Sequence, residues 1–270
     1  MLKFYYNGQQ GDEATMVAKL RAGQLDGAAL SAAGLSRIHR PLLALQMPGL
    51  FRQYKTVDRA STALYPSFRE AFDKKGFFLS SLGAMGRART FSKGRPIRTP
   101  ADLKTMKTVR LRSSVVDPAL AAIIKVHTVP LTVAEILPAL SVGRINVLTV
   151  PPLIAEQMQW APHLEYIGAD VVGIGIGAMV LSKTRLEAVP EDHLKILTKT
   201  GLKAGKMLRK RVRKQDDAAY QRLRGRMKVV KLTHAERRHW EKLATKIRRR
   251  LAQGTFSPQL VRRLEQLAGI

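Results

Sequence analysis

Apolar residues recur at two spacings along this chain, and the changes of spacing predict a succession of short strands and helices. Positions three or four residues apart predict helices at 12–22 and 57–74, and short apolar runs predict buried strands at 25–32 and 76–82. An irregular basic segment is expected at 85–91. Further strands are predicted at 2–6, 108–112, 129–131, 147–150 and 166–182, and further helices begin at 99, 118, 132 and 152. Interleaved helices and short strands indicate an α/β fold.

One pattern of residues occurs twice, at 20–30 and again 120 residues later at 140–150. In each copy an amphipathic stretch leads to a glycine, Gly23 or Gly143, and then to a short run of small and apolar residues. Glycine there suits the left-handed conformation in which many helices end, and the run suits a buried strand. The repeat predicts two similar α/β lobes that face each other across a cleft, a common place for a small ligand. Coincidence is the alternative, because helix, glycine, strand is frequent in α/β proteins.

The last third of the chain is predicted to be nearly all helix, and it carries much of the charge. Helices are expected at 191–227, at 233–252 and from residue 257 onward. The chain has 47 Lys and Arg against 20 Asp and Glu, a net charge of +27. From residue 203 onward, 21 basic residues stand against five acidic ones. Such an excess predicts attraction to nucleic acid, an anionic membrane or an acidic partner.

The sequence offers little for catalysis or for a membrane-spanning segment. No run approaches the ~20 consecutive apolar residues of a spanning helix, and the absence of cysteine excludes disulfides and thiolate chemistry. The six histidines lack metal-ligand spacing, and no nucleophile elbow, dinucleotide fingerprint or phosphate-binding loop occurs. We therefore expect a protein that is not an enzyme and that uses no metal or other cofactor.

Seven stretches carry motifs that follow one another in a recognisable order over most of residues 4–200. They are YNGQQGD (6–12), LRAGQLDG (20–27), MPGLF (47–51), FSKGRPIRTPADLK (91–104), VPL (129–131), ALSVGRIN (139–146) and VLSK (180–183). As an ordered set they resemble the solute-binding proteins of tripartite ATP-independent periplasmic (TRAP) transporters, in particular the dicarboxylate-binding type.

The resemblance implies a two-lobed α/β fold of periplasmic-binding-protein type II, with crossing hinge strands and a helical C-terminal region. Residues 1–85 would begin the first lobe, 86–172 would form the second, and 173–270 would return to the first and add basic helices. The implied function is capture of a small organic anion, in particular a carboxylate, in the periplasm and its delivery to a TRAP-type membrane permease. Relatives carry a first strand and helix before the point where this chain starts, so we expect that segment, and any signal peptide, to be missing here.

In this family an arginine on the second-lobe strand after the TPADLK motif pairs with the ligand carboxylate, which here implies Arg110 or Arg112. The two alternate with Leu111 and therefore share one face of a strand. A guanidinium suits the task because it donates two parallel, charge-assisted hydrogen bonds in a fixed geometry. A solvated basic edge of the sheet is the alternative.

Other candidate ligand contacts come from the same resemblance. Arg87 and Arg89 stand where relatives tend to have apolar or aromatic residues near the cleft. They form either an anion clamp or part of the surface of a twisted hinge segment. Ser31 and Gly34 are placed to offer hydrogen-bond donors at the carboxyl end of the first-lobe strand, and Phe51 forms either an apolar wall or part of the core.

Two candidate positions depart from the family pattern. Asn146 stands where the second copy of the repeat normally carries Asp, and Val150 stands where an Asn often precedes the proline. We include both among the candidate ligand-binding residues, and we expect recognition at these positions to differ from the usual kind.

Two other functions stay open on the sequence. One is a basic protein whose C-terminal helices bind nucleic acid or another polyanion, at least at low salt, and the other is a degenerate paralogue that keeps the fold without transport. Basic clusters at 206–214 and 246–250 favour polyanion contact, but no aromatic residues are interleaved with them. The sequence identifies neither the ligand, nor the permease, nor an oligomeric state.

Overall fold

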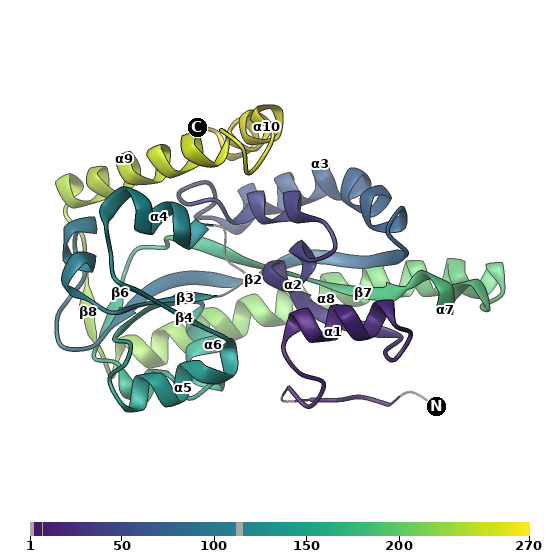
Figure 1. Cartoon of the computed structure of the whole chain (residues 1–270), viewed down its shortest axis with the longest axis horizontal. Helices are drawn as coiled ribbons and strands as arrows, with labels where there is room; N and C mark the ends of the chain where they lie inside the picture. Colours follow the sequence, from purple (N-terminus) through teal and green to yellow (C-terminus); the bar gives the residue numbers. More distant parts are fainter. Residues whose placement is uncertain (1–2, 7, 112–115) are drawn as a thin grey trace.

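The computed structural model describes residues 3–6, 8–111 and 116–270. The described strands form one eight-stranded sheet with the order β1–β7–β2–β5–β3–β4, and β6 and β8 extend it beside β2 (Figure 1). The strands are β1 (Gly27–Ser31), β2 (Phe77–Ser92), β3 (Thr108–Leu111), β4 (Thr128–Leu131), β5 (Val147–Val150), β6 (Tyr166–Gly168), β7 (Gly173–Ser182) and β8 (Lys228–Val230).

Helices cover this sheet and extend the chain beyond it. The α-helices are α1 (Glu13–Arg21), α2 (Ala32–Ser36), α3 (Tyr54–Asp73), α4 (Val116–Ile124), α5 (Val133–Ser141), α6 (Pro152–Gln157), α7 (Lys183–Glu187), α8 (Glu191–Arg224), α9 (His234–Leu251) and α10 (Pro258–Ala268). The 3-10 helices are η1 (Arg40–Gln46), η2 (Pro100–Thr105) and η3 (Ala161–His163). None of the described helices is long and apolar enough to cross a bilayer.

Two long antiparallel strands, β2 and β7, connect the two halves of the molecule. β2 pairs with β7 from Phe77 to Ala88, and its last residues, Arg89 to Ser92, pair with β5 and β6. On the other side β7 pairs with β1. The parallel strands β3, β4 and β5 belong to the second half alone, so the sheet is continuous across both halves only through β2 and β7.

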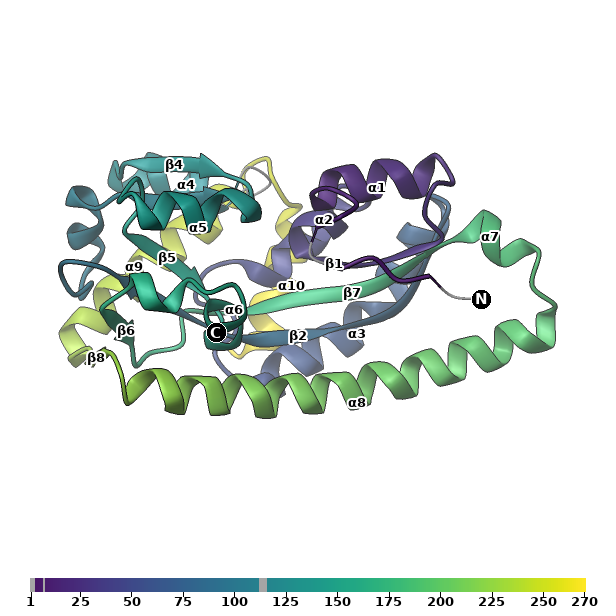
Figure 2. The same cartoon turned by 90° about the horizontal axis from the view of Figure 1, so that it is seen from below.

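Two large apolar cores make the halves into lobes, and a smaller third cluster lies around Leu103 and Met106. The first core gathers side chains of α1–α3, η1 and the C-terminal helices around Phe51, Phe72 and Leu79. The second gathers side chains around Phe91, Leu131 and Trp160. The 34-residue helix α8 runs along one side of both lobes (Figure 2). Within β2 and again near the start of β7, the chain passes from residues of one core to residues of the other. We therefore propose lobe boundaries close to residues 85 and 172.

The repeated pattern forms the same local structure in both lobes. Gly23 and Gly143 both adopt left-handed backbone conformations, with φ of 68° and 66°. The residue after each glycine donates its N–H to a carbonyl five residues earlier, Gln24 to Lys19 and Arg144 to Ala139. This is the Schellman arrangement that ends a helix. The first copy leads into β1 and the second into β5, so the repeat corresponds to structurally equivalent helix–strand units.

Three predicted elements differ in the structure, and one of them is the strand predicted at 166–182, which is two separate strands, β6 and β7. Lys3 to Tyr6 form no strand, and Phe4 and Tyr6 are exposed because no neighbouring strand covers them. The segment 85–91, expected to be irregular, is instead the continuation of β2. Its pairing with β7 shifts register between Ala84 and Gly86, which is a β-bulge. The bulge is the only irregular part of the segment's pairing with β7.

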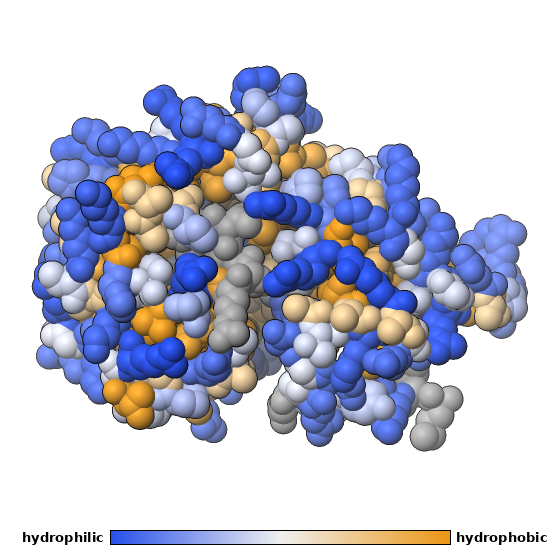
Figure 3. Space-filling view, viewed as in Figure 1, coloured by the Kyte–Doolittle hydropathy of each residue, from blue (hydrophilic) through white to orange (hydrophobic). Residues whose placement is uncertain are grey.

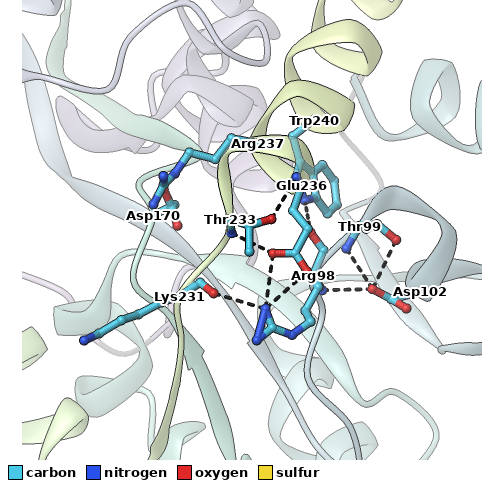
Figure 4. Close-up of polar contacts among 9 residues, drawn as sticks. All are labelled: Arg98, Thr99, Asp102, Asp170, Lys231, Thr233, Glu236, Arg237 and Trp240. Carbon is cyan, nitrogen blue, oxygen red and sulfur yellow. Dashed lines mark hydrogen bonds and ion pairs between the residues drawn. The ribbon is translucent and has the colours of Figure 1, made fainter.

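Helix α9 is fixed to the second lobe at its N-terminal end. Glu236 accepts from its own N-cap residue Thr233 and pairs with Arg98 at 3.2 Å, and the Trp240 indole donates to the Arg98 carbonyl at 2.7 Å (Figure 4). Arg237 pairs with Asp170 at 2.6 Å. Backbone and side-chain contacts together hold this end of α9 against the loop before η2 and the loop after β6.

The other end of α9 packs on the first lobe. Leu243, Ile247 and Leu251 lie in the first core. The buried Arg248 guanidinium donates to the Pro48 carbonyl and to Glu265 of α10. Helix α9 therefore joins the lobes a second time, independently of β2 and β7.

Candidate ligand site between the lobes

The molecular surface is hollowed between the lobe that carries α1 and α2 and the lobe that carries α5 and α6 (Figure 3). The ends of β1 and β5 approach this groove from opposite sides. Ser31, the last residue of β1, pairs with Gly177 of β7, and Val150, the last residue of β5, pairs with Arg89 of β2. The stretch of β7 between these points alternates glycine with isoleucine, and the Met85 side chain packs on its glycine face, where a Cβ built on Gly177 would collide with the Met85 sulfur.

The end of β1 binds a carboxylate that belongs to the chain itself. Glu13, in the first turn of α1, accepts from the Ser31 N–H at 2.6 Å, the Ser31 hydroxyl at 2.6 Å and the Gly34 N–H at 2.7 Å. The Ser31 hydroxyl also caps α2 by accepting from the Ala33 N–H. The donors predicted for a ligand are thus present and converge, but in this structure Glu13 satisfies them. Their use by a ligand stays a prediction.

The end of β5 binds a second internal carboxylate, and this one is buried. Asp216 of α8 is only 1% exposed and accepts from the Leu153 N–H in the first turn of α6 and from the Arg87 N–H of β2. The Tyr54 hydroxyl of α3 lies 3.4 Å from the same carboxylate. Burial raises the pKa of Asp216 above its ordinary value, although its two backbone donors act in the opposite direction.

The glycine at the bulge of β2 makes room for this carboxylate. Gly86 has φ of 139°, and a Cβ built on it would lie 2.6 Å from the Pro151 Cβ and 3.0 Å from the Asp216 carboxyl. A side chain at this position would therefore collide with both the start of α6 and the buried acid. The bulge, the start of α6 and Asp216 form one tightly packed crossing behind the groove.

Arg110 is the described candidate for a ligand carboxylate on the second lobe. It lies in β3, where Val109 and Leu111 pack on the second core, so Arg110 is on the opposite face of the strand. It is half-buried, and no hydrogen-bond or ion-pair partner lies near it among the residues the structure describes. The other candidate, Arg112, lies outside the described residues.

Arg87 and Arg89 have different surroundings from those expected of an anion clamp. Arg89 is 6% exposed, donates to the carbonyls of Gly168 and Ala169, and stacks on the Tyr220 ring of α8 with 3.6 Å between guanidinium carbon and ring centroid. The Arg87 guanidinium reaches Asp217 of α8. Both side chains therefore brace β2 against α8, and we revise their assignment accordingly.

Of the three other candidates, Val150 lies at the groove, whereas Phe51 and Asn146 do not. Phe51 is buried in the first core, which is the alternative that sequence reasoning had kept open. Asn146 precedes β5, so it lies at the opposite end of that strand from Val150, and its side chain accepts from the Lys107 N–H. Val150 does lie at the groove end of β5, where it is half-buried against the second core.

Sequence reasoning missed both internal carboxylates. Glu13 stands in the first turn of a helix, where acidic residues are common because they interact favourably with the helix dipole, so its position gave no sign of a contact with Ser31. Asp216 and Asp217 are an acidic pair inside a strongly basic helix, and that contrast was the available signal. Among the described residues, no three His, Asp or Glu side chains gather in a way that could hold a metal ion.

Two lobes joined by crossing strands, with a groove between the strand ends, have the architecture of a two-lobed binding protein. The sequence matches the family described as bacterial extracellular solute-binding protein, family 7, over residues 1–254, and the chain belongs to this family.

Solved structures of TRAP periplasmic solute-binding proteins share the fold. One from Shewanella oneidensis, with bound succinate, aligns with a TM-score of 0.89 at 17% identity, covering 97% of this chain and 86% of that one. One from Ralstonia eutropha H16, with bound (S)-2-acetolactate, has a TM-score of 0.86 at 22% identity and covers 96% and 84%. A Bordetella pertussis extracytoplasmic solute receptor that binds pyroglutamic acid has a TM-score of 0.88 at 16% identity and covers 99% and 88%.

Proposed function

We propose that this protein captures a small organic anion that carries a carboxylate, in the groove between its lobes, and delivers it to a TRAP-type membrane permease. Membership of the solute-binding family carries the proposal. The structural neighbours add to it, because their bound molecules, succinate, acetolactate and pyroglutamate, are all carboxylates. The chain would bind its solute without changing it chemically, as a receptor does.

Arg110 is the residue we assign to the ligand carboxylate, together with Arg112. Arg110 is half-buried and has no partner among the described residues, and a guanidinium can donate two parallel hydrogen bonds to one carboxylate. The remaining candidates are Val150, Ser31 and Gly34. Ser31 and Gly34 would contact the ligand only if it displaced the Glu13 carboxylate from their donors or shared those donors with it. Lobe closure would bring these groups around the anion through bending of β2 and β7.

A thermal-shift screen of monocarboxylates, dicarboxylates, 2-oxoacids and uronic acids at moderate salt tests the proposal. A ligand that binds only the folded state raises the melting temperature in a saturable way. We expect a selective rise with one class of acid. No rise with any carboxylate would contradict the proposed function.

Arg110→Ala tests the assigned residue. This substitution should make the binding free energy of the selected acid less favourable by about 1.5–3 kcal/mol, the usual contribution of a hydrogen bond to a charged group. Arg144→Ala is the matched control, because Arg144 is an exposed arginine beside the opposite end of the same strands. Equal affinities for native protein and Arg110→Ala would remove Arg110 from the site.

A further inference from the structure

The outward side of α8 carries a stripe of lysines that the fold does not use. Lys199, Lys203, Lys206, Lys210 and Lys214 are spaced four, three, four and four residues apart, so they lie along one side of the helix. All five are exposed. Among the described residues none of them has an acidic partner, whereas other cations of α8 do, such as Arg213 with Asp58 and Arg222 with Glu156.

The packing of α8 shows that this stripe faces away from the protein. A Cβ built on Gly205 would lie 2.7 Å from the Ser81 Cβ, so this side of the helix is pressed against β2. Lys203 and Lys210 are roughly half a turn around the axis from Gly205. The stripe from Lys199 to Lys214 is about 22 Å long at the rise of an α-helix.

Large apolar side chains are exposed beside the same lysines. Ile196 is 58% exposed, Met207 65% and Leu208 61%, and all three lie on the outer or flanking sides of α8. Figure 2 shows the beginning of this helix, together with α7, projecting past the rest of the fold. Exposed apolar groups next to unpaired cations are costly to leave in water unless a partner takes up both.

We propose that this face of α8 docks on the surface of an anionic phospholipid bilayer. Lysines near such a surface are attracted by the negative headgroups, and neighbouring Ile, Met and Leu side chains gain by entering the boundary with the acyl chains. Nucleic acid would satisfy the lysines but would give the apolar side chains nothing. The proposed delivery of a solute to a membrane permease would bring this extracellular solute-binding protein to a bilayer surface and not to nucleic acid. This inference does not depend on which solute is bound.

Co-sedimentation of the full chain with vesicles tests the docking surface. We expect binding to phosphatidylcholine vesicles that contain phosphatidylglycerol, much weaker binding to phosphatidylcholine alone, and loss of binding at high salt. Equal binding to both vesicle types, or to neither, would overturn the proposal.

Two variants and a control locate the effect. The triple change K203Q/K206Q/K210Q should weaken partition onto the anionic vesicles about tenfold or more, and I196S/M207S should weaken it several-fold at unchanged charge. The control K55Q/K93Q/K104Q removes three exposed lysines from other surfaces and should change partition onto the anionic vesicles far less. An equal loss of vesicle binding in the control variant would overturn the lipid assignment. So would binding to a DNA duplex that is tighter than binding to the vesicles and that I196S/M207S does not change. Unchanged melting temperatures and solute-induced shifts in the variants separate this result from a failure of folding or of the proposed function.

Discussion

The ends of β1 and β5 look alike in sequence, yet they hold their carboxylates in different ways. Each strand follows a glycine-ended helix and leads directly into a short helix. At β1 the acid is Glu13, 18 residues away in the same lobe and half-buried. At β5 it is Asp216, 63 residues from its partner Leu153 and nearly completely buried.

The difference shows that only one of these junctions is tied to the rest of the molecule. Glu13 joins α1 to the β1–α2 turn and so stabilises the first lobe by itself. Asp216 contacts β2, the start of α6 and Tyr54 of α3, so it holds together parts of both lobes at the point where the strands cross. We infer that the first-lobe junction is a local brace and that Asp216 sets the geometry of the crossing.

Removing the buried acid should have the largest effect. Asp216→Ala leaves the Arg87 and Leu153 N–H groups without their acceptor, and each unsatisfied buried donor costs about 1–3 kcal/mol. We expect the free energy of unfolding to fall by roughly 3 kcal/mol in urea denaturation. Asp217→Ala, which removes the exposed neighbouring acid, should cost less than about 1 kcal/mol. Similar losses in the two variants would contradict the role given to Asp216.

Changing the first-lobe acid should have a smaller effect. Glu13→Gln keeps one acceptor oxygen but turns an amide NH₂ toward N–H or O–H donors of Ser31 and Gly34. We expect a loss of about 1–2 kcal/mol, measured in the same way. Glu187→Gln, an exposed change at the end of α7, serves as the control. If Glu13→Gln were as stable as the native protein, the brace between α1 and the end of β1 would not exist.

The smallest expected effect is a difference in pH dependence. Because the pKa of Asp216 is raised above its ordinary value of 3.8, the folded protein holds this proton more tightly than the unfolded chain. The stability of the native protein relative to Asp216→Asn should therefore fall as pH rises from 3.8 through the raised pKa. Unfolding free energies across the acid range measure this slope. A relative stability that instead rises over that interval would show that the carboxylate is favoured as the ion in the fold.

Local signals in the sequence were sufficient for most of the fold. Gly23 and Gly143 marked two equivalent helix ends, and Thr99, Thr132 and Thr233 marked helix starts, because capping depends on residues only a few positions apart. The length of β2 was not predictable in this way. Its second half is basic and bulged, and it is a strand because it pairs with β7, β5 and β6, which lie far away in sequence, and packs against α8.

The candidate site was harder to predict because its contacts are distant in sequence. Arg89 looked like a ligand-binding residue, and nothing local indicated that Tyr220, far along the chain, would stack on it. Ser31 and Gly34 were predicted to offer donors to a ligand, and in the structure these donors bind Glu13, which comes from another element. The residue type determines which hydrogen bonds and ion pairs a side chain can form, whereas the tertiary fold determines with which partner it forms them.

Closure of the lobes on a carboxylate is the central claim, and a distance measurement between the lobes tests it most directly. The chain has no cysteine, so spin labels can be placed specifically at Ala18→Cys on α1 and Val133→Cys at the start of α5, two exposed positions on opposite lobes. Double electron–electron resonance should show a single shift to shorter distances when the acid selected by the thermal-shift screen is added to saturation. An unchanged distance distribution at saturating ligand would contradict capture by lobe closure.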